Sequence, residues 1–128
     1  MLAQAPGQQP ARDDSPEAKM ARRYPQPIRV GNLIGLPLID YDNREFAEIV
    51  DVVRTPEGKV RLIASYGRWF GWFGRSVSVP IEVVAIVGKQ VASLDMQPDE
   101  YRTAPTWTAG RDSRIPRDET IRIALTKR

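Results

Sequence analysis

From residue 28 onward the sequence consists of short apolar runs separated by turn residues, and this pattern constrains the fold most. The run Glu45 to Arg54 is rich in isoleucine and valine, and Lys59 to Tyr66 alternates apolar with mixed positions. Between them, Thr55-Pro56-Glu57-Gly58 has proline and glycine where a tight turn favours them. Two such runs joined by a turn predict a β-hairpin.

Further short runs repeat along the chain at intervals of about 8 to 12 residues, which is typical of a small barrel or sandwich. A closed barrel is favoured, because a small domain cannot leave long strand edges open. Pro98 and the acids after it predict a helix of at most two turns, and no longer helix is expected. The other predicted strands are Leu33 to Asp40, Ser76 to Val79, Ile81 to Val87, Val91 to Asp95 and Ile121 to Leu125.

Composition removes several classes of chemistry. The 128 residues suit one domain with tails, and they include no cysteine and no histidine. Disulfides, thiol nucleophiles, cysteine-rich zinc sites and histidine acid–base catalysis are therefore excluded. The formal charge of +3 comes from the tails, because residues 28–96 carry equal numbers of acidic and basic side chains. Nucleic acid is accordingly not expected as a partner of the folded part.

Residues 1–27 contain five prolines and few large apolar side chains, which predicts a disordered proline-rich tail. A short helix over Glu17 to Arg23 is conceivable, with nothing apolar to hold it to a core. The start Met1-Leu2-Ala3-Gln4-Ala5-Pro6 is similar to the small-residue end of a secretory signal. If a signal was removed ahead of Met1, the protein is expected in the periplasm, and otherwise in the cytoplasm.

The candidate functional residues lie between Gly67 and Arg75, where four large aromatic side chains stand among three glycines. Successive strand residues point to opposite faces, so all four rings cannot enter one small core. Two interpretations stay open: the rings cover one barrel end as a lid, or they form a contact patch with the flanking arginines. The predicted partner-binding residues are Arg68, Trp69, Phe70, Trp72, Phe73 and Arg75.

Two other patterns carry no chemistry. Asp40, Asp42 and Glu45 could offer oxygen ligands to calcium, but their spacing is that of an acidic turn rather than of a calcium loop. Gly67, Gly71 and Gly74 are spaced as in a dinucleotide site, but no helix start follows them. We therefore expect no catalytic residue, no cofactor and no metal site.

Several stretches of the sequence together resemble the PRC-barrel domain, over roughly residues 30–107. They are Leu33-Ile34-Gly35-Leu36-Pro37-Leu38, Glu48-Ile49-Val50-Asp51-Val52-Val53, Pro56-Glu57-Gly58, Gly67, Ser76-Val77-Ser78-Val79-Pro80, Ala92-Ser93-Leu94-Asp95-Met96 and Ala104-Pro105-Thr106-Trp107. Such barrels occur in the photosynthetic reaction-centre H subunit, in a ribosome-maturation factor and alone in many bacterial proteins. The sequence departs from the family pattern at two glycines. Asn43 replaces the usual glycine of the first hairpin turn, and Ala47 replaces the glycine expected just before the apolar part of the second strand.

The resemblance implies a highly curved barrel that acts as a docking module. The expected fold is all-β: a six-stranded antiparallel PRC-type barrel with a short helical turn and an extra C-terminal strand. The expected organisation is a tail over 1–27, the barrel over 28–107, and a loop and strand over 108–128. The expected function is non-enzymatic docking to a protein partner or to itself as a homo-oligomer. A peripheral membrane-surface module is the alternative, and an RNA- or ribosome-associated factor comes third.

Overall fold

The computed structural model describes residues 15–67 and 75–126, which form a strongly curved sheet with two short helices. The helices are α1 (Pro16–Ala21) and α2 (Pro98–Thr103), with 3-10 turns at Val30–Asn32 and Ile81–Val83. The strands are β1 (Gln26–Arg29), β2 (Pro37–Ile39), β3 (Glu45–Arg54), β4 (Val60–Tyr66), β5 (Arg75–Pro80), β6 (Val84–Val87), β7 (Gln90–Ser93), β8 (Ser113–Arg114) and β9 (Thr120–Leu125).

The predicted all-β class is confirmed, with differences in strand number and direction. The strands follow the order β1-β9-β6-β7-β2-β3-β4-β5, and β8 pairs with β3 beside this path. The structure thus describes nine strands, whereas six barrel strands and one C-terminal strand were expected. Two pairs, β2 with β7 and β6 with β9, are parallel, which corrects the expectation of an antiparallel barrel. Long intervening segments permit these parallel pairs, because parallel strands need a crossover connection of about a dozen residues or more.

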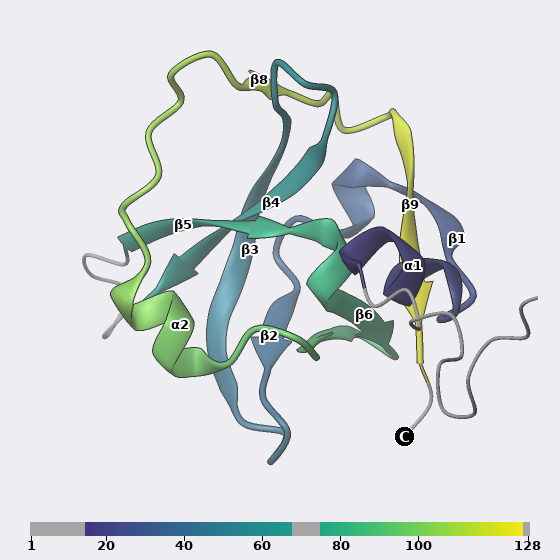
Figure 1. Ribbon diagram of the computed structural model, residues 1–128, viewed down its shortest axis with the longest axis vertical. Coiled ribbons are helices and arrows are strands. Elements are labelled where there is room, and N and C mark those ends of the chain that lie inside the picture. The colour runs from purple at the N-terminus through teal and green to yellow at the C-terminus, as the bar shows by residue number, and fades with distance from the viewer. Residues whose placement is uncertain (1–14, 68–74, 127–128) are drawn as a thin grey trace, which may run out of the picture.

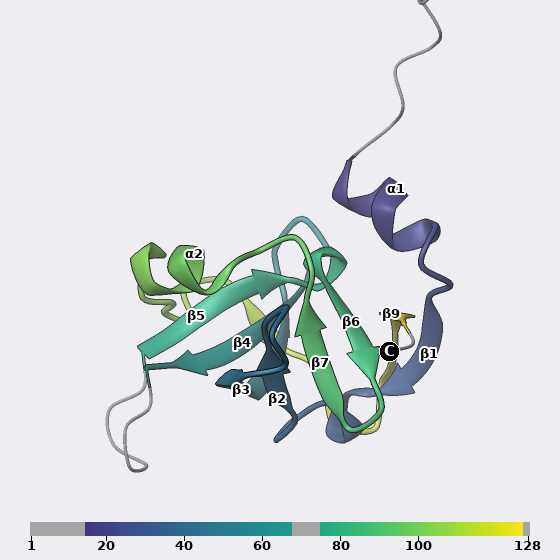
Figure 2. The ribbon, with the colours of Figure 1, turned by 90° about the horizontal axis from the view of Figure 1, so that it is seen from below.

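The path also has two ends, so the predicted closed barrel is observed as an open, curved sheet. No strand pair among the described residues joins β1 to β5. The two ends lie on opposite sides of the molecule: β5 and α2 on one, β1, β9 and α1 on the other (Figures 1 and 2). Each side therefore presents its own surface.

The central hairpin is as predicted, except that β4 begins at Val60 and not at Lys59. β3 and β4 pair through Val52 and Leu62, both fully buried, with a bulge between Ile49 and Asp51. The turn between them closes where the Gly58 amide donates to the Thr55 carbonyl at 2.8 Å. Gly58 has a φ of 85°, the left-handed backbone that glycine adopts without steric cost.

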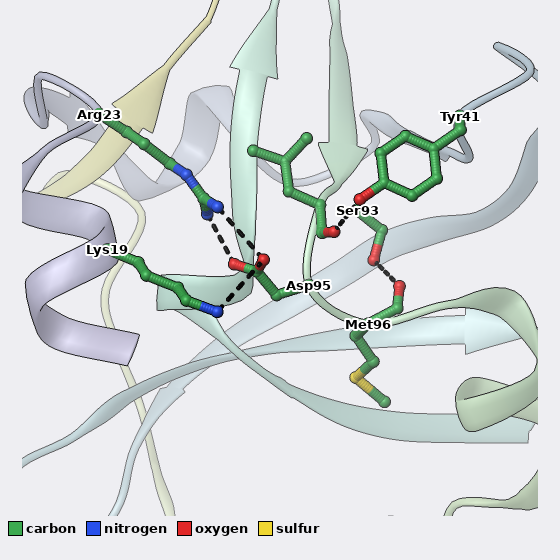
Figure 3. A network of polar contacts seen from close by, with 7 residues as sticks. Lys19, Arg23, Tyr41, Ser93, Asp95 and Met96 are labelled. Carbon is green, nitrogen blue, oxygen red and sulfur yellow. Dashed lines mark hydrogen bonds and ion pairs between the residues drawn. The ribbon is translucent and has the colours of Figure 1, made fainter. Parts of the chain in front are cut away.

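Residues 15–27 differ from the predicted disordered tail. Helix α1 begins after Ser15, whose side-chain oxygen accepts from the Ala18 amide, and Met20 packs against the core. The Arg23 guanidinium donates to both carboxylate oxygens of Asp95, at 2.7 and 3.2 Å, and Lys19 lies 3.9 Å from the same carboxylate (Figure 3). Asp95 is 72 residues away in the chain, so local sequence patterns could not reveal this contact.

The C-terminal strand is confirmed and closes one side of the core. β9 pairs antiparallel with β1, with Ile121 opposite Ile28, and parallel with β6, with Ala124 opposite Ala85. Ile121 and Ile123 are buried, as their alternation with polar residues predicts. The segment is thus part of the sheet and not a tail.

Candidate docking surface

An aromatic cluster fills the end of the sheet next to α2. The ring centroids of Phe46 and Tyr101 lie 4.8 Å apart in an edge-on arrangement, and Tyr66 lies 6.3 Å from each of them. These separations are typical of favourable aromatic pairs. Because Phe46 belongs to β3, Tyr66 to β4 and Tyr101 to α2, the cluster holds the helix against the sheet.

Tyr101 is fully buried, and its hydroxyl is satisfied by a short chain of hydrogen bonds. Ser93 donates its hydroxyl proton to the Met96 carbonyl at 2.5 Å, so the Tyr101 hydroxyl, 2.7 Å away, donates to Ser93 (Figure 3 shows Ser93 and Met96). Burial raises the pKa of Tyr101 well above its usual value. Tyr101 therefore stays neutral and structural.

Arg75, one of the predicted contact residues, starts β5 opposite Tyr66. Its guanidinium donates to the carbonyls of Tyr101 at 2.8 Å and Ala104 at 2.5 Å, and also to that of Arg102. The last carbonyls of a helix lack partners within the helix and favour a nearby cation. Arg75 thus fixes β5 to the C-terminal end of α2, and its part in partner binding stays a prediction.

The other predicted contact residues, Arg68, Trp69, Phe70, Trp72 and Phe73, lie outside the described residues. The structure does show where their segment joins the sheet. It follows Gly67, whose φ of 75° suits glycine, and it ends at Arg75. A cleft of about 330 Å³ opens beside Gly67, lined by Glu45, Phe46, Ala47, Glu48, Ser65 and Gly67. We call this region, with Tyr66, Arg75 and α2, the α2 end.

A second cleft, of about 620 Å³, lies on the opposite side of the molecule. Its lining residues are Arg22, Arg23, Tyr24, Ile86, Gly88, Leu125 and Thr126. Sequence reasoning missed this site, because it brings together the tail, the β6–β7 turn and the end of β9. The sequence around Tyr24 contains no motif that would have indicated a binding site.

Asp40, which was considered for calcium, and Asp51 in β3 both have structural roles. The Asp40 carboxylate accepts from the amides of Asp42 and Arg44, which stabilises the turn before β3. Asn43 in this turn has a φ of 62°, consistent with its replacing a glycine. Asp51 pairs with Arg114 at 2.8 Å. Over residues 15–67 and 75–126, no three potential ligand side chains gather closely enough for a metal.

A small, strongly curved sheet with the short helix α2 across one end has the architecture of a small β-barrel-like domain. The family model of the PRC-barrel domain matches residues 26–93, just over half of the chain. The chain therefore belongs to the PRC-barrel domain family, and the resemblance found in the sequence is confirmed. The match runs from the first residue of β1 to the last of β7.

The comparison with curated proteins finds no match to this chain. Neither described helix is long and apolar enough to cross a membrane.

Proposed function

We propose that this chain is a non-enzymatic docking module whose α2 end binds a protein partner or a second copy through residues 68–75. The observation that carries the proposal is the fixation of Arg75, which lies opposite Tyr66, to three carbonyls at the C-terminal end of α2. The two ends of the aromatic segment are thus held by a rigid helix and a rigid hairpin. A fixed support lowers the entropy lost when a contact segment binds.

The composition of the segment supports the same proposal. Tryptophan and arginine dominate the residues on which protein interfaces depend, and this segment has both within a few positions. The cleft beside it adds two carboxylates, those of Glu45 and Glu48, to the aromatic edge of Phe46. The exposed carboxylate of Glu45 favours a protein surface over an anionic membrane, which it would repel.

Docking by side chains is also favoured because the outer edge of each end strand is interrupted for strand addition. Directly after β1, the Val30 amide donates toward the β9 side, to the Glu119 carbonyl at 2.9 Å. By alternation, position 27 faces outward, and Pro27 has no amide proton to offer. On β5, the Ser76 carbonyl already accepts from the Trp107 amide at 2.6 Å.

A photocrosslinking experiment tests the proposal. p-Benzoylphenylalanine replaces Phe70 in one variant and Tyr41, an exposed tyrosine of another surface, in the control. We expect the probe at 70, and not at 41, to crosslink one defined protein or a second copy, and excess unlabelled chain to suppress the product. Equal crosslinking from both positions would contradict the proposal. Flotation with anionic vesicles, lost on Trp72→Ala, would favour the membrane-surface alternative.

A further inference from the structure

Tyr24 combines a strained backbone with an exposed ring. Its φ is 55°, a left-handed backbone that is rare for a bulky side chain and lies outside the range preferred before a proline such as Pro25. Its ring is 78% exposed, so burial does not offset this strain. Strained backbone of this kind concentrates at functional sites, which makes Tyr24 a candidate contact residue.

The neighbouring hydrogen bonds fix Tyr24 in this conformation. Three successive carbonyls are each bound: that of Arg23 by the Leu125 amide at 3.2 Å, that of Tyr24 by the Gln26 side chain at 3.3 Å, and that of Pro25 by the Arg122 guanidinium at 2.7 Å. The Arg23–Asp95 ion pair holds the same stretch from the other side. The backbone that carries the ring is therefore organised before any partner arrives.

The ring lies at a cleft with apolar lining. Tyr24 shares the 620 Å³ cleft with Ile86 and with Leu125, which is 42% exposed. Two exposed apolar side chains on the rim of one cleft offer a site for an apolar residue of a partner. This site is separate from the α2 end, because the elements that line it lie on the other side of the sheet (Figures 1 and 2).

The charges around the cleft specify the partner. Lys19 and Arg23 share a single carboxylate, that of Asp95, so this group keeps a net positive charge. Lys89 follows the lining residue Gly88, is exposed, and makes no side-chain hydrogen bond or ion pair with any residue that the structure describes. A positive rim around an apolar cleft complements an acidic segment with an apolar residue.

We propose that the cleft at Tyr24, Ile86 and Leu125 is a second docking site, which binds an acidic peptide segment of a partner protein. The apolar residue of that segment contacts Tyr24 and Leu125, and its carboxylates face Lys89 and the Lys19–Arg23 pair. The site does not depend on residues 68–75, so a failure of this proposal leaves the proposed function of the α2 end unaffected.

A random dodecapeptide phage library tests the proposal, selected on the intact chain and subtracted on Tyr24→Gly. Glycine accepts positive φ without strain, so this variant should keep or raise the melting temperature while it removes the ring. We expect the enriched peptides to be acidic with at least one apolar residue. A labelled representative should bind Tyr24→Gly at least about tenfold more weakly, and Trp72→Ala and Tyr41→Ala as tightly as the unchanged chain.

Lys89→Glu, in an exposed turn, is a second variant that leaves the core untouched. It should weaken binding of the same peptide several-fold, and added salt should reduce the difference in affinity between this variant and the unchanged chain. The proposal is overturned if no peptide is enriched, if the enriched peptides lack an acidic bias, or if they bind Tyr24→Gly and Lys89→Glu as tightly as the unchanged chain. Binding of anionic vesicles or of nucleic acid that depends on Tyr24, in place of peptide binding, would also overturn it.

Discussion

The Arg75 guanidinium lies 2.8 Å from the Tyr101 carbonyl oxygen, and through this bond the first residue of β5 holds the C-terminal end of α2. The same guanidinium also reaches the carbonyls of Arg102 and Ala104. One side chain thus satisfies helix carbonyls that have no partner within the helix. The arginine that ends the aromatic segment therefore has a structural role of its own.

Arg75→Ala should lower the free energy of unfolding by about 1.5 to 3 kcal/mol, the range for hydrogen bonds to a charged group. Arg75→Lys should lose less of the free energy of unfolding than Arg75→Ala, since lysine keeps the charge but not the planar set of guanidinium donors. Urea denaturation measures both. Arg44→Ala, at an exposed position in a turn, is the matched control and should stay within about 0.5 kcal/mol. If the Arg75→Ala variant were equally unaffected, the helix would not depend on this contact.

Tyr101 makes stability sensitive to high pH. Its folded pKa is raised above 10.0 by burial, whereas in the unfolded chain it titrates near 10.0. The contribution of Tyr101 to the free energy of unfolding is thus fully present below pH 10. It falls as the pH rises above 10, because the unfolded chain then loses the proton while the folded chain keeps it. We expect Tm to fall between about pH 10 and 11 more steeply in the unchanged chain than in Tyr101→Phe. Parallel pH profiles would contradict this role.

Asp95 should control the docking of α1. Asp95→Asn removes the carboxylate shared by Arg23 and Lys19, and the amides of residues 17–24 should then exchange their hydrogens faster. The loss of overall stability should be modest, about 1 kcal/mol, because the pair is partly exposed to solvent. Asp99→Asn breaks an exposed pair with Arg102 and is the control. Unchanged exchange in α1 after Asp95→Asn would show that the helix does not depend on these ion pairs.

The sequence predicted the parts of the fold that depend on local chemistry. The β3–β4 hairpin, the turn at Gly58, α2 and the alternation of β9 follow from turn residues, helix start signals and period-two patterns. The β1–β9 pair and the parallel neighbours of β2 and β6 depend on contacts between distant segments, which no local pattern encodes. The ordered structure of residues 15–27 likewise depends on contacts with distant segments, so the sequence did not predict it.

The candidate site divides in the same way. The clustering of aromatics and arginines was visible in the sequence, but the engagement of Arg75 by α2 was not. The proximity of Phe46 and Tyr66 could have been found by counting the hairpin back from its turn, allowing for the bulge at Ile49. The cleft at Tyr24 had no sequence signal, since positive φ at a tyrosine is a property of the folded chain.

Truncation after Ala109 should destabilise the protein severely. It removes Ile115, Ile121 and Ile123 from the core and leaves β1 without its only described strand neighbour. Loss of three large buried side chains exceeds the stability of a typical small domain. Circular dichroism of the truncated chain should show no cooperative unfolding. A cooperative transition at an unchanged temperature would show that β9 is dispensable.

The docking proposal is tested most directly by comparing stability with association in Trp69→Ala and Trp72→Ala. Binding is measured by sedimentation over a concentration series for self-association, and by the crosslink from position 70 for a partner. Arg68→Ala completes the set, whereas Arg75 is left intact because its substitution would disturb α2. We predict that at least one tryptophan variant keeps its unfolding free energy within about 1 kcal/mol while association weakens about tenfold or more. The proposal is contradicted if both variants lose about 3 to 5 kcal/mol, as core residues do, and Arg68→Ala leaves association unchanged.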